Sequence, residues 1–124
     1  MLDERYNAMD LVLRELPSIA EVTVSGEVTR ISIESFPKDF ENHARQLISQ
    51  GYSHFLVGID VDHMNSMGFG AIIAVHSWAK KRSGDLAVYT RRKPILDLIS
   101  MFKCPQIFFV SREAALCYLL RENP

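Results

Sequence analysis

The residues at 55–60 constrain the fold of this chain most strongly, because they form a nearly continuous apolar run. A short run that is apolar at successive positions, such as Leu56 and Val57, is typical of a central strand that is covered on both faces. Such a strand requires helices on both sides of its sheet. The run therefore predicts a layered α/β domain.

Strand and helix patterns alternate from this strand to the end of the chain. The position of Gly84 predicts the end of the helix that follows the strand, and the position of Ser111 predicts the N-cap of the last helix. Alternation of this kind predicts parallel neighbouring strands joined by right-handed crossovers. The predicted elements are helices over 71–82, 94–102 and 112–121 and strands over 86–90 and 106–110.

The part before residue 55 predicts a helix, a β-hairpin and a second helix. Apolar residues at 2, 6, 9, 13 and 16 recur at helical spacing, which predicts an amphipathic helix ended by Pro17. Alternating residues around Gly26 predict a hairpin over 22–33. Pro37 then opens a helix that Ser35 caps and Gly51 ends. We expect a helical extension over residues 1–17 and an α/β domain over 18–124, with a mixed, mostly parallel sheet, an N-terminal hairpin and flanking helices.

The composition fits one globular domain and excludes several classes of function. The chain has 124 residues, 48% of them hydrophobic, and its 14 basic and 15 acidic residues give a net charge of -1. There is no basic surplus for nucleic acid or an acidic membrane surface. The first residues do not form a signal peptide, and no apolar run approaches the roughly 20 residues of a membrane span. We expect a cytoplasmic protein, without membrane insertion or nucleic-acid binding, whose partners are proteins.

A short run, residues 65–70, joins the apolar strand to the next helix. It places Ser66 at the mouth of that helix, where unpaired N–H groups and the positive end of the helix dipole favour an anion. Ser66 could therefore carry or approach a phosphate. Taken alone, the run favours a simpler role, in which Ser66 or Asn65 beside it is only the N-cap of the helix, because these residue types cap helices more often than they carry phosphate.

The order of the elements and the run at Ser66 resemble the STAS domains, a family whose stand-alone members include bacterial anti-sigma factor antagonists. The resemblance covers residues 20–120 and is one of layout and pattern. In that family the strand runs into a loop that reads Asp-Ser-Ser-Gly or Asp-Ser-Thr-Gly, followed by an apolar residue and a glycine. The matching residues in this sequence are Asn65, Ser66, Met67, Gly68, Phe69 and Gly70.

The resemblance implies a STAS-like fold and a protein that is not an enzyme. It would bind a kinase-type anti-sigma factor and release it when Ser66, the counterpart of the family's phosphorylated serine, is phosphorylated. The implied partners are this anti-sigma factor or a serine kinase of the same pathway, and a phosphatase; a homodimer is left open, and no cofactor or metal is implied. The implied partner-binding residues are Asn65, Ser66, Met67, Gly68, Gly70 and Asp60.

The loop departs from the family pattern at two positions. Asn65 replaces the acidic residue, and Met67 replaces the second hydroxyl residue. We expect Met67 to be exposed and Phe69 to be buried. The two glycines would allow close approach either by the backbone of a partner or by the domain's own sheet.

Two other functions remain open. One keeps the fold without the phosphoswitch, as a constitutive scaffold or a transporter-associated subunit, and Asn65 and the predicted N-terminal helix motivate it. The other is a small α/β enzyme that uses Asp60, Asp62 or His63 near the same helix. A nucleotide site is disfavoured, because the loop lacks the third glycine of a dinucleotide fingerprint and the lysine of a P-loop.

Overall fold

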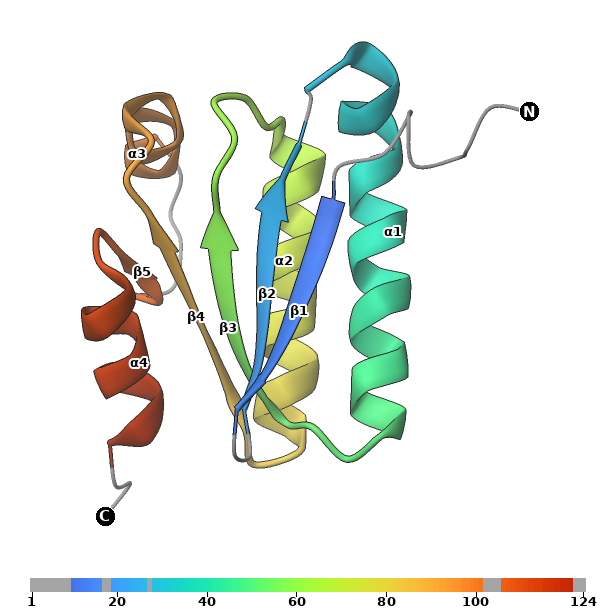
Figure 1. Ribbon diagram of the computed structural model, residues 1–124, viewed down its shortest axis with the longest axis vertical. Helices are drawn as coiled ribbons and strands as arrows, with labels where there is room; N and C mark the ends of the chain where they lie inside the picture. Colours follow the sequence, from blue (N-terminus) through green and yellow to red (C-terminus); the bar gives the residue numbers. More distant parts are fainter. Residues whose placement is uncertain (1–9, 17–18, 27, 102–105, 122–124) are drawn as a thin grey trace.

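Five strands form one sheet, in the order in which they follow one another along the chain (Figure 1). β1 (Asp10–Leu16) pairs antiparallel with β2 (Ile19–Ser25). β3 (His54–Ile59), β4 (Asp85–Thr90) and β5 (Phe108–Phe109) then follow, each parallel to its predecessor. The carboxyl ends of β2 to β5 consequently lie at one edge, the upper edge in Figure 1. The computed structural model describes residues 10–16, 19–26, 28–101 and 106–121.

The helices divide between the two faces of the sheet. α1 (Arg30–Ser49) and α2 (Ser66–Lys81) lie side by side on one face, and α4 (Arg112–Leu120) lies on the other (Figure 1). α3 (Lys93–Ser100) follows β4 at the upper edge and contributes the buried Ile95 to the core beneath α1 and α2. A smaller core lies beneath α4 and consists of Ile19, Leu56, Ala87, Ala115 and Leu119. The mixed, mostly parallel α/β sheet with flanking helices is as predicted and fits a STAS-like fold, but its N-terminal hairpin is formed by β1 and β2 rather than by residues 22–33.

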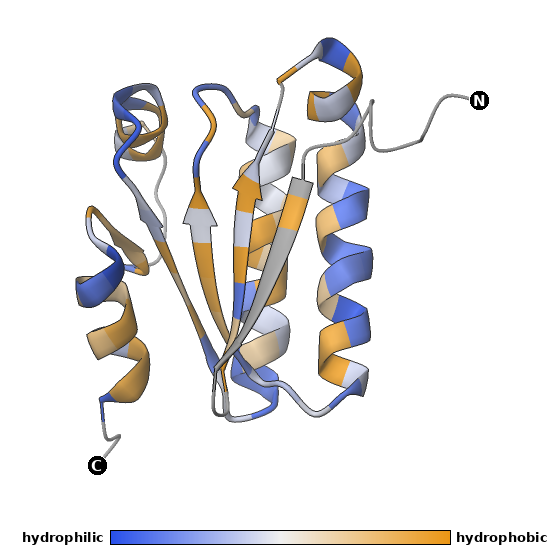
Figure 2. Ribbon diagram, in the orientation of Figure 1, coloured by the Kyte–Doolittle hydropathy of each residue, from blue (hydrophilic) through white to orange (hydrophobic). Residues whose placement is uncertain are grey.

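The apolar run at 55–60 has the predicted position in the sheet. Every residue of β3 after His54 is buried, and the strand lies between β2 and β4. Figure 2 shows the central strands as mainly hydrophobic and α1 as a helix with many polar residues. Burial on both faces explains why the run has no polar alternation.

The predicted helix at the N-terminus is wrong for residues 10–16, which form β1, and the rest of it lies outside the described residues. β1 pairs with β2 over its whole length, from Asp10 opposite Ser25 to Leu16 opposite Ile19. The apolar spacing from residue 2 to 16 fits a helix locally, but pairing with β2 is a tertiary contact that overrides the local pattern. The predicted boundary at residue 17 is therefore wrong as well, because β1 belongs to the sheet rather than to an extension.

The predicted hairpin around Gly26 and the predicted helix start at Pro37 are also wrong. α1 already begins at Arg30, and its N-cap is Thr29 rather than Ser35, with Ser32 completing a capping box. The residues that α1 buries are spaced for a helix from its first turn onward. Pro37 lies inside the helix, where one backbone hydrogen bond is absent. The buried residues of α1 are Ser32, Phe36, Phe40, Ala44 and Leu47.

The later elements are confirmed with small changes at their ends. α2 begins five residues before the predicted start, at Ser66, and α3, β5 and α4 lie within or within one residue of the predicted ranges. Ser111 is the N-cap of α4, as predicted, and its hydroxyl accepts the Ala114 N–H at 3.1 Å. Among the helices that the structure describes, none is both long and apolar enough to cross a membrane.

Candidate functional site

The start of α2 lies at the edge of the sheet where β3 ends. Residues 60–65 connect Ile59 to the helix. The N-cap of α2 is Asn65, whose backbone is extended and whose side-chain oxygen accepts the Gly68 N–H at 3.0 Å. Asn65 therefore satisfies one of the free donors of the first turn.

Ser66 is the first residue of α2, and it is exposed. Its hydroxyl makes no hydrogen bond with any residue that the structure describes. The backbone N–H groups of Ser66 and Met67 precede the first helical bond, which the Phe69 N–H donates to the Asn65 carbonyl at 3.3 Å. They add to the positive end of the helix dipole. The N-cap role thus belongs to Asn65, and the Ser66 hydroxyl is left in solvent.

The residues after Ser66 divide between the surface and the core, with Met67 and Gly70 exposed and Gly68 and Phe69 buried. Met67 is 69% exposed and Phe69 is 2% exposed, so both predictions for these side chains are confirmed. A Cβ at Gly68 would lie 2.7 Å from Met64 Cγ, whereas a Cβ at Gly70 would meet open space. Gly68 therefore allows close packing inside the domain, and only Gly70 leaves room for another molecule. Ser66, Met67 and Gly70 lie within about one turn of each other on the helix.

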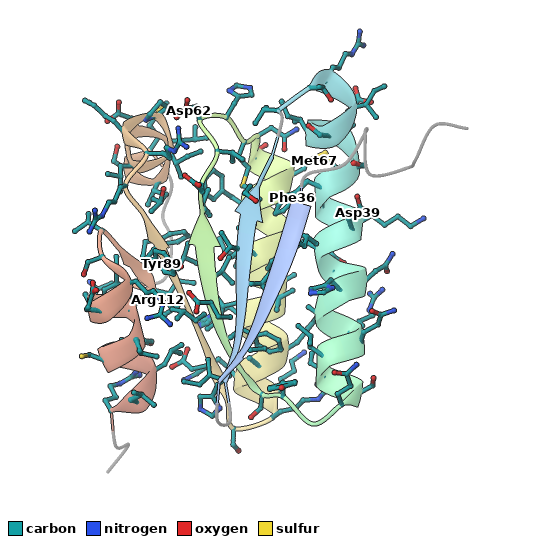
Figure 3. All side chains as sticks on the ribbon, viewed as in Figure 1. Phe36, Asp39, Asp62, Met67, Tyr89 and Arg112 are labelled. Atoms are coloured by element: carbon teal, nitrogen blue, oxygen red, sulfur yellow. The ribbon has the colours of Figure 1, made fainter. Side chains whose placement is uncertain are left out.

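Asp60 and Asp62, at the other end of the connecting segment, are joined by Arg92. The Arg92 Nη2 and Nε donate to Asp60 Oδ1 at 2.7 and 3.0 Å, and Nη1 donates to Asp62 Oδ1 at 3.0 Å. The hydrogen bond to Asp60, and then the one to Asp62, raise the pKa of Arg92. Figure 3 shows Asp62 at the upper edge of the molecule, near the end that α3 occupies. This guanidinium links the ends of β3 and β4.

Asp60, Asp62 and His63, which the alternative of a small α/β enzyme would use, do not form a metal site among the described residues. Both carboxylates face Arg92, and His63 is exposed. Over the described ranges, no group of three or more His, Cys, Asp or Glu side chains could hold a metal ion. Of the six predicted partner-binding residues, Asn65, Ser66, Met67 and Gly70 lie together, Gly68 is buried beneath them, and Asp60 lies apart beside Arg92.

A second polar cluster, which sequence reasoning missed, lies between the sheet and α4. Glu21 on β2 is 4% exposed, and both of its carboxylate oxygens accept hydrogen bonds from Arg112, each at 2.8 Å. Tyr89 on β4 donates its hydroxyl to Glu21 Oε2 at 2.7 Å. The bond to Glu21 raises the pKa of Arg112, and burial, followed by the same carboxylate, raises the pKa of Tyr89. Figure 3 shows Tyr89 and Arg112 on the α4 side of the sheet.

The sequence carried only one signal for this cluster. Glu21 is a charged residue within a strand that is otherwise mainly apolar, which indicates a partner on the same face. Its partners lie 68 and 91 residues further along the chain, so no local pattern identifies them.

Comparison with known proteins gives a likeness of fold alone. The chain is similar to the protein TM1081, whose structure was solved by NMR, with a TM-score of 0.73 and 14% sequence identity. The match covers 91% of this chain and 90% of TM1081. No protein-family model and no curated protein matches the sequence.

Proposed function

We propose that this chain is a cytoplasmic STAS-type protein, similar to anti-sigma factor antagonists, that binds a kinase-type anti-sigma factor and is released when Ser66 is phosphorylated. The observation that carries the proposal is the unused hydroxyl of Ser66 at the start of α2. A serine that caps its helix has a structural reason to be there. Ser66 has no such reason, because Asn65 is the cap.

A phosphate on Ser66 would be compatible with the fold. It adds about two negative charges at the positive end of the α2 dipole, next to the free N–H groups of the first turn. The Ser66 side chain is exposed, so the phosphate would remain hydrated. The domain is therefore expected to stay folded in both states, which a reversible switch requires.

The same phosphate would weaken the binding of a partner that covers the start of α2. Met67 offers a large exposed apolar side chain there, and Gly70 leaves open space one turn further on. A partner that buries Met67 would have to desolvate the neighbouring phosphate or repel it. Phosphorylation would thus act as an off switch.

The chemistry of transfer would be supplied by the partner. The Ser66 oxygen would attack the γ-phosphorus of ATP held by a kinase, ADP would leave, and a base of the kinase would take the hydroxyl proton. Asn65 stands where the family has an acidic residue, and its side chain is bound to the Gly68 N–H. An amide does not position the Ser66 hydroxyl or bind a metal in the kinase complex as a carboxylate does, so transfer is expected to be slow.

Asn65 also supports a second candidate, a constitutive scaffold or transporter-associated STAS subunit. In this case the start of α2 would still bind a partner through Met67, but Ser66 would stay unmodified. The amide of Asn65 caps the helix as well as a carboxylate would, so its presence needs no kinase.

Capture of proteins from the source organism separates the two candidates. The protein, Ser66→Ala and Ser66→Asp are immobilised, and retained proteins are identified by mass spectrometry. The proposal predicts that the parent and Ser66→Ala retain a kinase-type anti-sigma factor that Ser66→Asp loses. Ser77→Asp, an equal charge change at an exposed residue further along α2, is the control and is expected to retain it. Equal retention by all four proteins would favour the scaffold.

A further inference from the structure

A cavity of about 290 Å³ opens on the α4 side of the sheet, away from the exposed start of α2. It lies at the carboxyl ends of β2, β3 and β4, where parallel sheets commonly bind ligands. The floor of the cavity includes Thr23, Gly58 and Tyr89 from the three strands. The lining also includes Arg112 and Glu113 at the start of α4, and Arg91, which follows the end of β4.

The floor of the cavity is tightly built and electrically balanced. A Cβ at Gly58 would lie 2.6 Å from Tyr89 Cζ, so only glycine lets the phenol ring lie across β3. The Tyr89 hydroxyl and the Arg112 guanidinium both bind Glu21 beneath it. The carboxylate and the guanidinium neutralise each other, and this leaves the floor without net charge.

Two charged side chains at the mouth of the cavity, Arg91 and Glu113, have no ion pair with a residue that the structure describes. Arg91 and Glu113 are both exposed, and neither makes an ion pair or side-chain hydrogen bond with any other residue that the structure describes. Asp60 also lines the cavity, but Arg92 holds it at 2.7 Å. Among the described residues, Arg91 and Glu113 are therefore a cation and an anion at the cavity without a hydrogen-bonded ion pair. After the larger effect of Glu21, Glu113 lies near enough to Arg112 to raise the pKa of that guanidinium as well.

We propose that this cavity binds a free α-amino acid. The carboxylate of the ligand would bind Arg91, its ammonium group would bind Glu113, and its side chain would lie over the Tyr89 ring. Glu113 would repel a ligand that carries only negative charge, and Arg91 would repel a ligand that carries only positive charge. The volume is near the lower end of ligand sites, which suits a molecule of this size and excludes a dinucleotide. The inference does not depend on Ser66 being a phosphorylation site.

Thermal unfolding in the presence of each standard amino acid tests the proposal with the intact protein. At least one amino acid is expected to raise the unfolding midpoint by a few degrees when it is about tenfold above its dissociation constant. The N-acetyl derivative of that amino acid lacks the ammonium group and its amide lacks the carboxylate, so both should lose at least tenfold in affinity. If no amino acid raises the midpoint, or if either derivative binds as well, the proposal is wrong.

Two substitutions assign the response to the cavity. Arg91→Gln and Glu113→Gln change exposed side chains and are expected to keep the fold, which the circular dichroism spectrum checks, while each loses at least tenfold in affinity. The matched controls are Arg82→Gln and Asp39→Asn, which remove the same charges at residues that do not line the cavity. Figure 3 shows Asp39 on α1, on the other side of the molecule. Undiminished binding by Arg91→Gln and Glu113→Gln would overturn the assignment.

Discussion

α2 and α4 both begin with a side-chain N-cap, but the first residue of each helix has a different role. Each helix has a polar N-cap that accepts a backbone N–H three residues on, Asn65 from Gly68 at 3.0 Å and Ser111 from Ala114 at 3.1 Å. The first residue of α4, Arg112, binds the buried Glu21, whereas the first residue of α2, Ser66, binds nothing that the structure describes. The start of a helix can therefore be wholly structural, as in α4, or can leave one side chain available, as in α2.

The ends of the two helices are alike, so the difference lies at their starts. His76 and Lys80 of α2 approach Asp85 at 3.4 and 3.7 Å, and Arg121, which follows α4, approaches it at 3.3 Å. Asp85 is 4% exposed at the beginning of β4. One carboxylate therefore fixes helices on both faces of the sheet.

The largest effect is expected from breaking the anchor of α4. Arg112→Gln would remove both guanidinium hydrogen bonds from the buried carboxylate of Glu21, so the free energy of unfolding should fall by about 3 kcal/mol. Urea denaturation measures this loss. Arg82→Gln, which removes an exposed guanidinium, should change stability by less than about 0.5 kcal/mol. A loss of that small size in Arg112→Gln would show that the cluster does not hold α4.

The shared carboxylate at the helix ends should give the next effect, together with a dependence on pH. Burial raises the pKa of Asp85. The opposing effect is larger, because the pKa is lowered by the Leu86 N–H, Lys80, Tyr118 and Arg121, and the net pKa lies below its ordinary value of 3.8. A carboxylate with a depressed pKa stabilises the fold above its unfolded pKa and loses this effect as the pH falls through its folded pKa.

Asp85→Asn is therefore expected to lower the free energy of unfolding by about 2 kcal/mol at neutral pH. The difference between parent and variant should narrow as the pH is lowered below 3.8. Urea denaturation at a series of pH values checks this. A difference that stays constant down to pH 2 would contradict the depressed pKa.

The two glycines at the start of α2 should respond in opposite directions. Gly68→Ala places a methyl group 2.7 Å from the buried Met64 side chain, so we expect a loss of about 1.5 kcal/mol from overpacking. Gly70→Ala points into open space within a helix and should stabilise the protein by about 0.5 to 1 kcal/mol. Thermal or urea unfolding of both variants measures the pair. Equal effects would mean that Gly68 is not packed against the core.

The smallest effects test the comparison of the two helix starts itself. Asn65→Ala and Ser111→Ala each remove an N-cap and should each lower stability by about 1 kcal/mol. Ser66→Ala should change it by only a few tenths of a kcal/mol, because its hydroxyl has no partner among the described residues. The same unfolding assay decides the matter. If Ser66→Ala lowers the free energy of unfolding as much as Asn65→Ala does, Ser66 has a structural role.

The sequence predicted the second half of the fold well because its signals are local there. The apolar run of β3 and the helical spacing of α2 depend on neighbouring residues, and so does the cap at Ser111. The prediction of a helix at β1 is wrong because the spacing of its own apolar residues does not indicate its pairing with β2. The start of α1 was missed because Val28, Ile31 and Ile33 also fit a strand.

The candidate site shows the same limit. The position of Ser66 at a helix start followed from the change of pattern at residues 65–70. Whether Asn65 or Ser66 caps the helix could not be predicted, because both side chains can accept the bond and only the backbone geometry decides. The pairing of Glu21 with Arg112 spans 91 residues and depends on the arrangement of β2 and α4.

Locating phosphate in the protein after incubation with ATP and an extract of the source organism shows whether Ser66 is the residue that becomes phosphorylated. Peptides are analysed by mass spectrometry, and Ser66→Ala is treated in parallel. We expect phosphate on Ser66, none on Ser111, and no substitute site in Ser66→Ala. Phosphate on Ser111, or no phosphate on Ser66 while the extract modifies an added substrate of the same pathway, would contradict this expectation.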